Sequence, residues 1–87
     1  MARVFIPTML QTLTGGAKEV TLEARNVRLV VEGLEALYPG IKERLVEDGR
    51  LRPNLAVAVD GETSRMGLLE KVSPDSEVHF IPAIGGG

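Results

Sequence analysis

The sequence contains no cysteine and a single histidine, His79, among its 87 residues. Without cysteine there can be no disulfide, thiolate nucleophile or thiolate metal ligand, and one histidine cannot form a metal site alone. The glycine-rich phosphate-binding motifs and the paired-histidine zinc motif are also missing. We therefore expect no bound metal and no bound cofactor, and the sequence disfavours an enzyme that performs chemistry with its own side chains.

Aromatic residues are also few, and neither basic nor acidic residues predominate. The three aromatic residues, Phe5, Tyr38 and Phe80, are too few for a base-stacking platform. Ten basic and twelve acidic residues are interspersed, so no basic stripe indicates nucleic acid. No apolar run approaches the roughly 18 residues of a membrane span, and the first residues lack the pattern of a signal peptide. These absences predict a cytoplasmic protein that binds neither nucleic acid nor membrane.

The first half of the chain has the pattern of a hairpin followed by a helix. Alternating apolar residues predict strands over residues 2–7 and 19–23, joined through a turn at residues 14–16. Asn26 is placed to cap a helix over residues 27–37, which Pro39-Gly40 ends. The apolar residues of this segment recur at helical spacing: Val27, Val30, Val31, Leu34 and Leu37.

The second half is predicted to be mostly extended. Residues 41–46 favour one short helical stretch, and residues 54–59 and 77–81 favour strands. Asp60-Gly61 predicts a turn into a short edge strand over 62–66, and Leu68-Leu69 predicts a turn or 3₁₀ segment that packs beneath the sheet. The stretch over residues 73–76 reads as a turn that leads into the last strand.

The order of these elements predicts an α+β fold of the β-grasp type. Such a fold has a mixed sheet of four to five strands with one main helix packed on one face. The last strand should lie parallel to the first, because it returns by a long crossover. We expect one domain over residues 1–84 and a flexible glycine tail over 85–87.

The chain ends in Gly85-Gly86-Gly87, a thread without side chains that carries a carboxylate. Glycine permits close approach, so such a thread can enter an active site that any β-carbon would block. A carboxylate becomes a good acyl donor once ATP converts it into an acyl-adenylate, which a sulfur or nitrogen nucleophile can attack. We therefore predict that Gly87 reacts and that a partner binds Gly85 and Gly86.

Alternation along the strands also predicts a docking surface. The face turned away from the helix should be polar in a two-layer fold, yet several of its residues are apolar. We expect a partner interface formed by Phe5, Ala56, Ala58, His79 and Ile81, together with Ile84 beside the tail. His79 reads as a surface strand residue rather than a catalytic one. Arg50 and Arg52 could attract an acidic partner, although exposed arginines commonly have no such role.

The turn at residues 73–76 and the strand from Glu77 through Ile84 into the glycines resemble those of the ubiquitin-like sulfur carriers. The resemblance covers essentially the whole chain. Residues 6–8, 14–18 and 34–41 look most like the members that serve thiocarboxylate-dependent cysteine synthesis. Residues 51–57 resemble the molybdopterin-type members equally well.

The resemblance implies a carrier that is a co-substrate rather than an enzyme. A ubiquitin-activating-like enzyme would use ATP to adenylate Gly87, and sulfur would convert the adenylate to a thiocarboxylate. A cysteine-synthase-like or other sulfur-inserting enzyme would then accept the sulfur. Three alternatives stay open: the small subunit of molybdopterin synthase, which works with a large subunit; a ubiquitin-like modifier conjugated to lysines; and an interaction module with an inert tail.

The number of terminal glycines departs from the family pattern. Members usually end in two glycines, and this chain ends in three. Either Gly86-Gly87 is the functional pair, or Gly87 is removed to expose Gly86. We prefer the first interpretation.

Overall fold

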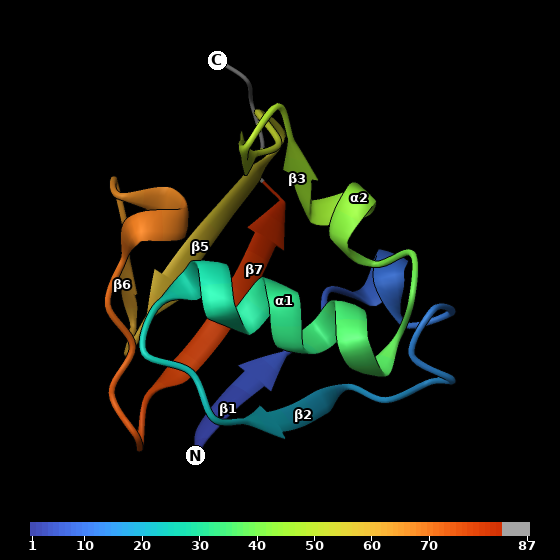
Figure 1. The fold of residues 1–87 in the computed structure, drawn as a ribbon, viewed down its shortest axis with the longest axis horizontal. Coiled ribbons are helices and arrows are strands. Elements are labelled where there is room, and N and C mark those ends of the chain that lie inside the picture. The colour runs from blue at the N-terminus through green and yellow to red at the C-terminus, as the bar shows by residue number, and fades with distance from the viewer. Residues whose placement is uncertain (83–87) are drawn as a thin grey trace.

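A β-hairpin opens the fold, which the computed structural model describes over residues 1–82 (Figure 1). Strand β1 (Ala2–Phe5) pairs antiparallel with β2 (Glu19–Leu22), as predicted. The connection contains a 3₁₀ segment, η1 (Thr8–Leu10), and turns at Gly15 and Gly16, whose φ angles are 64° and 90°. Glycine adopts these positive angles without the clash that a β-carbon would cause.

Helix α1 (Val27–Leu37) follows and begins where the sequence predicts. The Oδ1 atom of Asn26 accepts a hydrogen bond of 2.8 Å from the Leu29 amide, which satisfies one free donor of the first turn. Leu37 shares the helical spacing of the apolar residues, but it does not join the buried face that this spacing predicts, since its side chain is 52% exposed. Tyr38, just beyond the helix, packs against the core instead.

A short helix and a small hairpin come next. Helix α2 (Lys42–Leu45) begins beneath the carboxylate of Glu35, which accepts hydrogen bonds from the Gly40 and Lys42 amides. These bonds hold the pKa of Glu35 below its usual range. Strands β3 (Val46–Glu47) and β4 (Arg50–Leu51) then form a separate two-stranded sheet that the sequence pattern did not predict.

The rest of the chain builds the other half of the main sheet. Strand β5 (Leu55–Val59) turns at Asp60-Gly61 into the edge strand β6 (Glu62–Thr63), which is shorter than predicted. The 3₁₀ segment η2 (Gly67–Leu69) is present, but Leu69 is 72% exposed, so the expectation that both leucines pack beneath the sheet is wrong. Strand β7 (Glu77–Pro82) is the last described element.

The main sheet is mixed and has five strands in the order β2-β1-β7-β5-β6. The last strand lies at its centre, parallel to β1 and antiparallel to β5. Helix α1 crosses one face of this sheet (Figure 1). This arrangement confirms the predicted α+β fold of the β-grasp type, whereas the predicted domain boundary after residue 84 lies outside the described residues.

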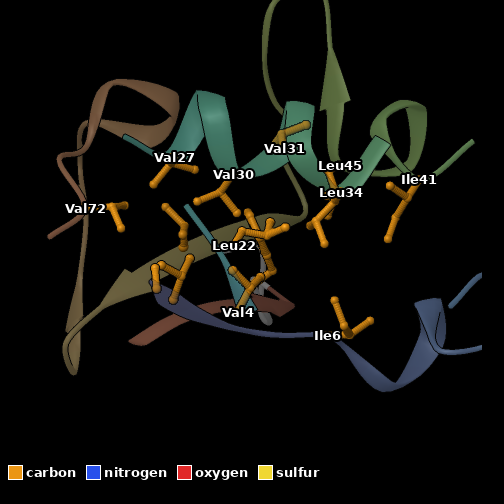
Figure 2. Packing of buried hydrophobic residues seen from close by; sticks show 14 of the residues in the cluster. Val4, Ile6, Leu22, Val27, Val30, Val31, Leu34, Ile41, Leu45 and Val72 are labelled. Carbon is orange, nitrogen blue, oxygen red and sulfur yellow. The ribbon is translucent and has the colours of Figure 1, made fainter. Parts of the chain in front are cut away.

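The hydrophobic core fills the space between α1 and the sheet. Figure 2 shows side chains of α1 directed toward Val4, Ile6 and Leu22, with Val72 and Ile41 at the two sides and Leu45 beside Leu34. Val4, Val57 and Val78 come from three neighbouring strands and are 0% exposed. Each buried side chain of this size contributes about 1.5–3 kcal/mol relative to an exposed one. The side chains on the face of the sheet that meets α1 therefore stabilise the fold and are not accessible to a partner.

We expect Asn26→Ala to lower the free energy of unfolding by about 1 kcal/mol, because it removes the side-chain acceptor at the start of α1. Urea denaturation measures this loss. Asn26→Asp is the matched control, since aspartate accepts the same bond and is equally favoured at this position. Equal losses in both variants would contradict a capping role.

Candidate functional site

The position of β7 determines where the described part of the chain ends. This strand lies between β1 and β5, and its last described residue, Pro82, pairs with Leu55 at the start of β5. The pairing with β1 extends only to Phe5, which lies opposite His79. Residues 80–82 therefore continue past the end of β1, and the glycines follow them in the sequence.

Hydrogen bonds from the β5–β6 turn fix the start of β7. The two carboxylate oxygens of Asp60 accept a bond of 2.9 Å from the Glu77 amide and one of 2.8 Å from the Ser76 hydroxyl. Ser76 is buried, and its oxygen also accepts a bond of 2.9 Å from the Ser73 amide. The loop before β7 is thus joined to the turn after β5, which sets the register of the central strand.

These bonds hold the pKa of Asp60 below its usual range, with the Glu77 amide contributing most and the Ser76 hydroxyl next. Desolvation of the carboxylate acts in the opposite direction and raises the pKa. A group whose pKa is lowered by folding contributes stability above its unfolded pKa of about 3.9. That contribution is lost as the pH falls through the folded pKa.

We expect Asp60→Asn to destabilise the domain at pH 7, and this difference from wild type to shrink as the pH falls below about 4. Asparagine tolerates the left-handed backbone at this position, where φ is 53°, so the variant tests the charge rather than the turn. Urea denaturation across this pH range measures the effect. The exposed Asp75 provides the control Asp75→Asn. A difference that stays constant with pH would contradict the assignment.

The sheet face turned away from α1 brings the predicted interface residues together. Phe5 lies opposite His79 in register, and His79 lies opposite Ala58, so the three share one row across β1, β7 and β5. Ile81 and Ala56 form the next row toward the end of β7. The side chains between these rows, including Val57, Val78 and Phe80, are buried on the helix side. We call this set, Phe5, Ala56, Ala58, His79 and Ile81, the open sheet face.

The open sheet face has a charged end and an apolar end. At the charged end, Arg3 forms ion pairs of 2.7 Å with Glu19 and 3.2 Å with Glu77. The hydrogen bond between Arg3 and Glu19 raises the pKa of the guanidinium and lowers the pKa of the carboxyl. At the apolar end, Ile81 is 39% exposed and adjoins the last described residue, Pro82.

A stacked pair of rings lies between these two ends. The rings of Phe5 and His79 are 4.1 Å apart between centroids and 5° from parallel. The Arg3 guanidinium lies 5.2 Å from the centroid of Phe5, and Nε2 of His79 lies 3.6 Å from a carboxylate oxygen of Glu77. The stack orders two flat, half-buried side chains in the middle of the face. A stacked pair of this kind is largely preformed, and preformed surfaces lower the entropy cost of binding.

A shallow hollow of about 520 Å³ lies beside the apolar end. One side is formed by the end of β1 and by η1, including Pro7, Thr8 and Met9. The other side is formed by β7 from His79 to Pro82. Met9 is 59% exposed at this position. Pro82, the last described residue, is thus flanked by an apolar, open surface of the kind that partner proteins cover.

The predicted site residues fall into two groups. Phe5, Ala56, His79 and Ile81 lie together on the open sheet face. Ala58 lies in the same row but is 7% exposed, so it offers little area to a partner. Ile84, Gly85, Gly86 and Gly87 lie outside the described residues. The roles of all these residues in binding or reaction stay predictions.

The sequence reasoning missed the contribution of η1 to this site. Pro7, Thr8 and Met9 belong to an irregular connection, and strand alternation says nothing about where such residues point. The block at residues 6–8, which carries part of the family resemblance, is the one signal that could have found them.

Comparison with protein families decides the classification, since the model of the ThiS family matches residues 4–87. This chain belongs to the ThiS family. Among the curated relatives of this ThiS-family chain is the sulfur carrier protein CysO of Mycobacterium tuberculosis. It is 36% identical over 89 aligned positions, which cover 97% of this chain and 96% of that protein. These likenesses support a sulfur-carrier function, and the name of the relative describes a carrier and not an enzyme.

Solved structures with the same fold include relatives of this family. A chain in the crystal structure of the Amycolatopsis orientalis BexX/CysO complex superposes with a TM-score of 0.92 at 35% identity, covering 100% of both chains. The small archaeal modifier protein 1 of Methanosarcina acetivorans superposes with a TM-score of 0.81 over 99% of this chain and 95% of that one. Its identity of 23% shows a shared ubiquitin-like fold alone.

Two further findings concern membranes and metals. Among the helices of residues 1–82, none is long and apolar enough to cross a membrane. In the same described part of the chain, no three histidine or acidic side chains gather as they would around a metal ion.

Proposed function

We propose that this ThiS-family chain carries sulfur as a thiocarboxylate on the carboxyl group of Gly87. A ubiquitin-activating-like enzyme transfers AMP from ATP to that carboxylate and releases pyrophosphate. Hydrosulfide then attacks the carbonyl carbon, AMP leaves, and the C–O bond to AMP is replaced by a C–S bond. If the sulfur comes from a protein persulfide, the first product is an acyl disulfide, and a second thiol of the donor protein must break its S–S bond, forming a disulfide and releasing the thiocarboxylate. The resulting thiocarboxylate is the nucleophile that delivers sulfur to an acceptor enzyme. ATP is bound by the activating partner, not by the carrier.

One observation carries this proposal: the family match extends through residue 87 and therefore includes the three glycines. The full-length likeness to a protein named as a sulfur carrier supports it. The composition is consistent with such a role, because a chain without cysteine has no side-chain thiolate that would compete for the activated acyl group.

The open sheet face supports recognition by the activating enzyme. Its apolar end and the hollow beside η1 both adjoin Pro82, and the glycines begin three residues later in the sequence. A partner that covers this end holds the folded domain next to its own active site. The carrier then contributes binding surface and one carboxylate, while the partner supplies the catalysis.

The acceptor that fits best is an enzyme that incorporates sulfur into cysteine or another small metabolite. The likeness to CysO of Mycobacterium tuberculosis favours this choice over the small subunit of molybdopterin synthase. Conjugation to lysine is the alternative of another class, and it shares the adenylation step but ends in an isopeptide bond.

ATP–pyrophosphate exchange tests the first step directly. The purified chain is mixed with a ubiquitin-activating-like enzyme from the same cell, ATP and labelled pyrophosphate. We expect exchange that requires the carrier and saturates with its concentration. Exchange at the same rate with and without the chain would exclude it as the substrate of that enzyme.

A further inference from the structure

A second hollow lies on the helix side of the molecule, away from the open sheet face. It has a volume of about 650 Å³ and lies where α1, the β3–β4 hairpin and η2 meet. In Figure 1, η2 is the orange turn beside β5 and β6, and the hairpin lies above α1. We call this second hollow the basic hollow, because it is lined by arginines from three separate segments: Arg28, Arg50 and Arg65.

The charges around the basic hollow are unbalanced. Glu32 and Lys42 also line it, but they form an ion pair of 2.6 Å with each other. Within residues 1–82, none of the three arginines has a carboxylate within ion-pair distance, whereas Arg3 and Arg52 do. The whole chain carries a net charge of −2, so this concentration of positive charge is local. Guanidinium groups without a carboxylate partner of their own bind carboxylates or phosphates.

The floor and rim of the basic hollow are apolar. Leu51 and Leu68 are half-buried and pack against the core. Met66 and Leu69 stand at the rim with 57% and 72% of their surfaces exposed. Two large, exposed apolar side chains that line the same hollow as three arginines are typical of a protein contact rather than of scattered surface residues.

We propose that the basic hollow binds an acidic segment of a partner protein that inserts one apolar side chain between Met66 and Leu69. The carboxylates of the segment pair with Arg28, Arg50 and Arg65. A nucleic acid is disfavoured because no aromatic side chain lines the hollow for stacking. The hollow and the open sheet face lie on opposite sides of the sheet, so one carrier can hold two partners at once.

The probe is a synthetic peptide in which glutamates flank a single leucine, titrated into the full-length ¹⁵N-labelled chain. We expect amide shifts that cluster at residues 28, 50 and 65–69 and that weaken with added salt. Arg65→Glu should weaken binding by about fivefold or more. Arg44→Glu is the matched control, because Arg44 is exposed and lines a different hollow while the change in net charge is identical.

Further peptides and variants test the apolar part of the proposal. Replacing the peptide leucine by serine, or Leu69 by serine, should also weaken binding, and neither change alters charge. Absent shifts, shifts centred elsewhere, or equal losses in Arg65→Glu and Arg44→Glu would overturn the proposal. Equally tight binding of tripolyphosphate or a single-stranded oligonucleotide would also overturn it, since neither carries a carboxylate or an aliphatic side chain. These results are independent of whether Gly87 is adenylated.

Discussion

Conversion of the Gly87 carboxylate to an amide is expected to reduce ATP–pyrophosphate exchange to the rate seen without carrier. The amide keeps every atom of the folded domain and all three glycines, but it removes the oxygen that attacks the α-phosphate of ATP. Adenylation has no other route if this carboxylate is the reacting group. The matched control is the same semisynthetic chain ligated as the free acid.

Deletion of Gly87 separates the two possible registers of the tail. If Gly86-Gly87 is the functional pair, the deletion shortens the thread by one residue, about 3.3–3.6 Å. Exchange should then fall well below that of the full chain. If Gly86 is the true reacting residue, the deletion should support exchange at least as well as the full chain. Full exchange by the amidated chain would contradict both registers.

Substitution of Ile81 by aspartate is expected to lower kcat/KM for adenylation by about 30-fold or more, the loss that corresponds to removal of an interface hot spot of about 2 kcal/mol. Ile81 lies at the apolar end of the open sheet face and is 39% exposed. A charge there must lose its water when the partner docks. The domain should stay folded, because the side chain already contacts solvent.

Leu29→Asp is the matched control for Ile81→Asp. Leu29 is 42% exposed and lies in the first turn of α1 on the helix side, where a carboxylate is favourable. The variant Leu29→Asp should therefore leave the kinetics of adenylation unchanged. Phe5→Asp should also impair adenylation, but it removes the stack on His79 as well, so urea denaturation must accompany it. Unchanged adenylation kinetics in both Ile81→Asp and Phe5→Asp would contradict docking through this face.

Much of the fold follows from local sequence signals. The cap at Asn26 and the turn at Asp60-Gly61 depend on neighbours within a few residues, and both are present as predicted. The parallel pairing of β1 with β7 follows from the long crossover between them. Alternation of side chains along those strands correctly separates Val4 and Val78 from Phe5 and His79.

Other features depend on contacts that no local pattern contains. Strands β3 and β4 have two residues each, too few for alternation to be visible, although Asp48-Gly49 is a hairpin signal. Leu37 fits the helical spacing, yet the helix ends before the core can cover it. Arg50 and Arg52 look alike in the sequence, but Arg52 binds the Glu43 carbonyl and Glu47, while Arg50 lines the basic hollow.

The candidate site divides in the same way. The open sheet face could be derived from alternation, because opposite faces of a strand follow from its backbone geometry. The hollow beside η1 and the basic hollow could not, since each joins segments that are distant in the sequence. The chemistry proposed for Gly87 was derived from the terminal glycines and from the resemblance of the whole chain to the sulfur-carrier family.

Intact-protein mass spectrometry tests the thiocarboxylate most directly. The chain is incubated with its activating enzyme, ATP and a sulfur source, or is recovered from its own cell, and is then fragmented to locate any change. We expect a gain of about 16 Da, the replacement of one oxygen by sulfur, confined to the fragment that ends in Gly87. A chain that remains entirely the unmodified acid, or that is recovered only as lysine adducts, would contradict the sulfur-carrying role.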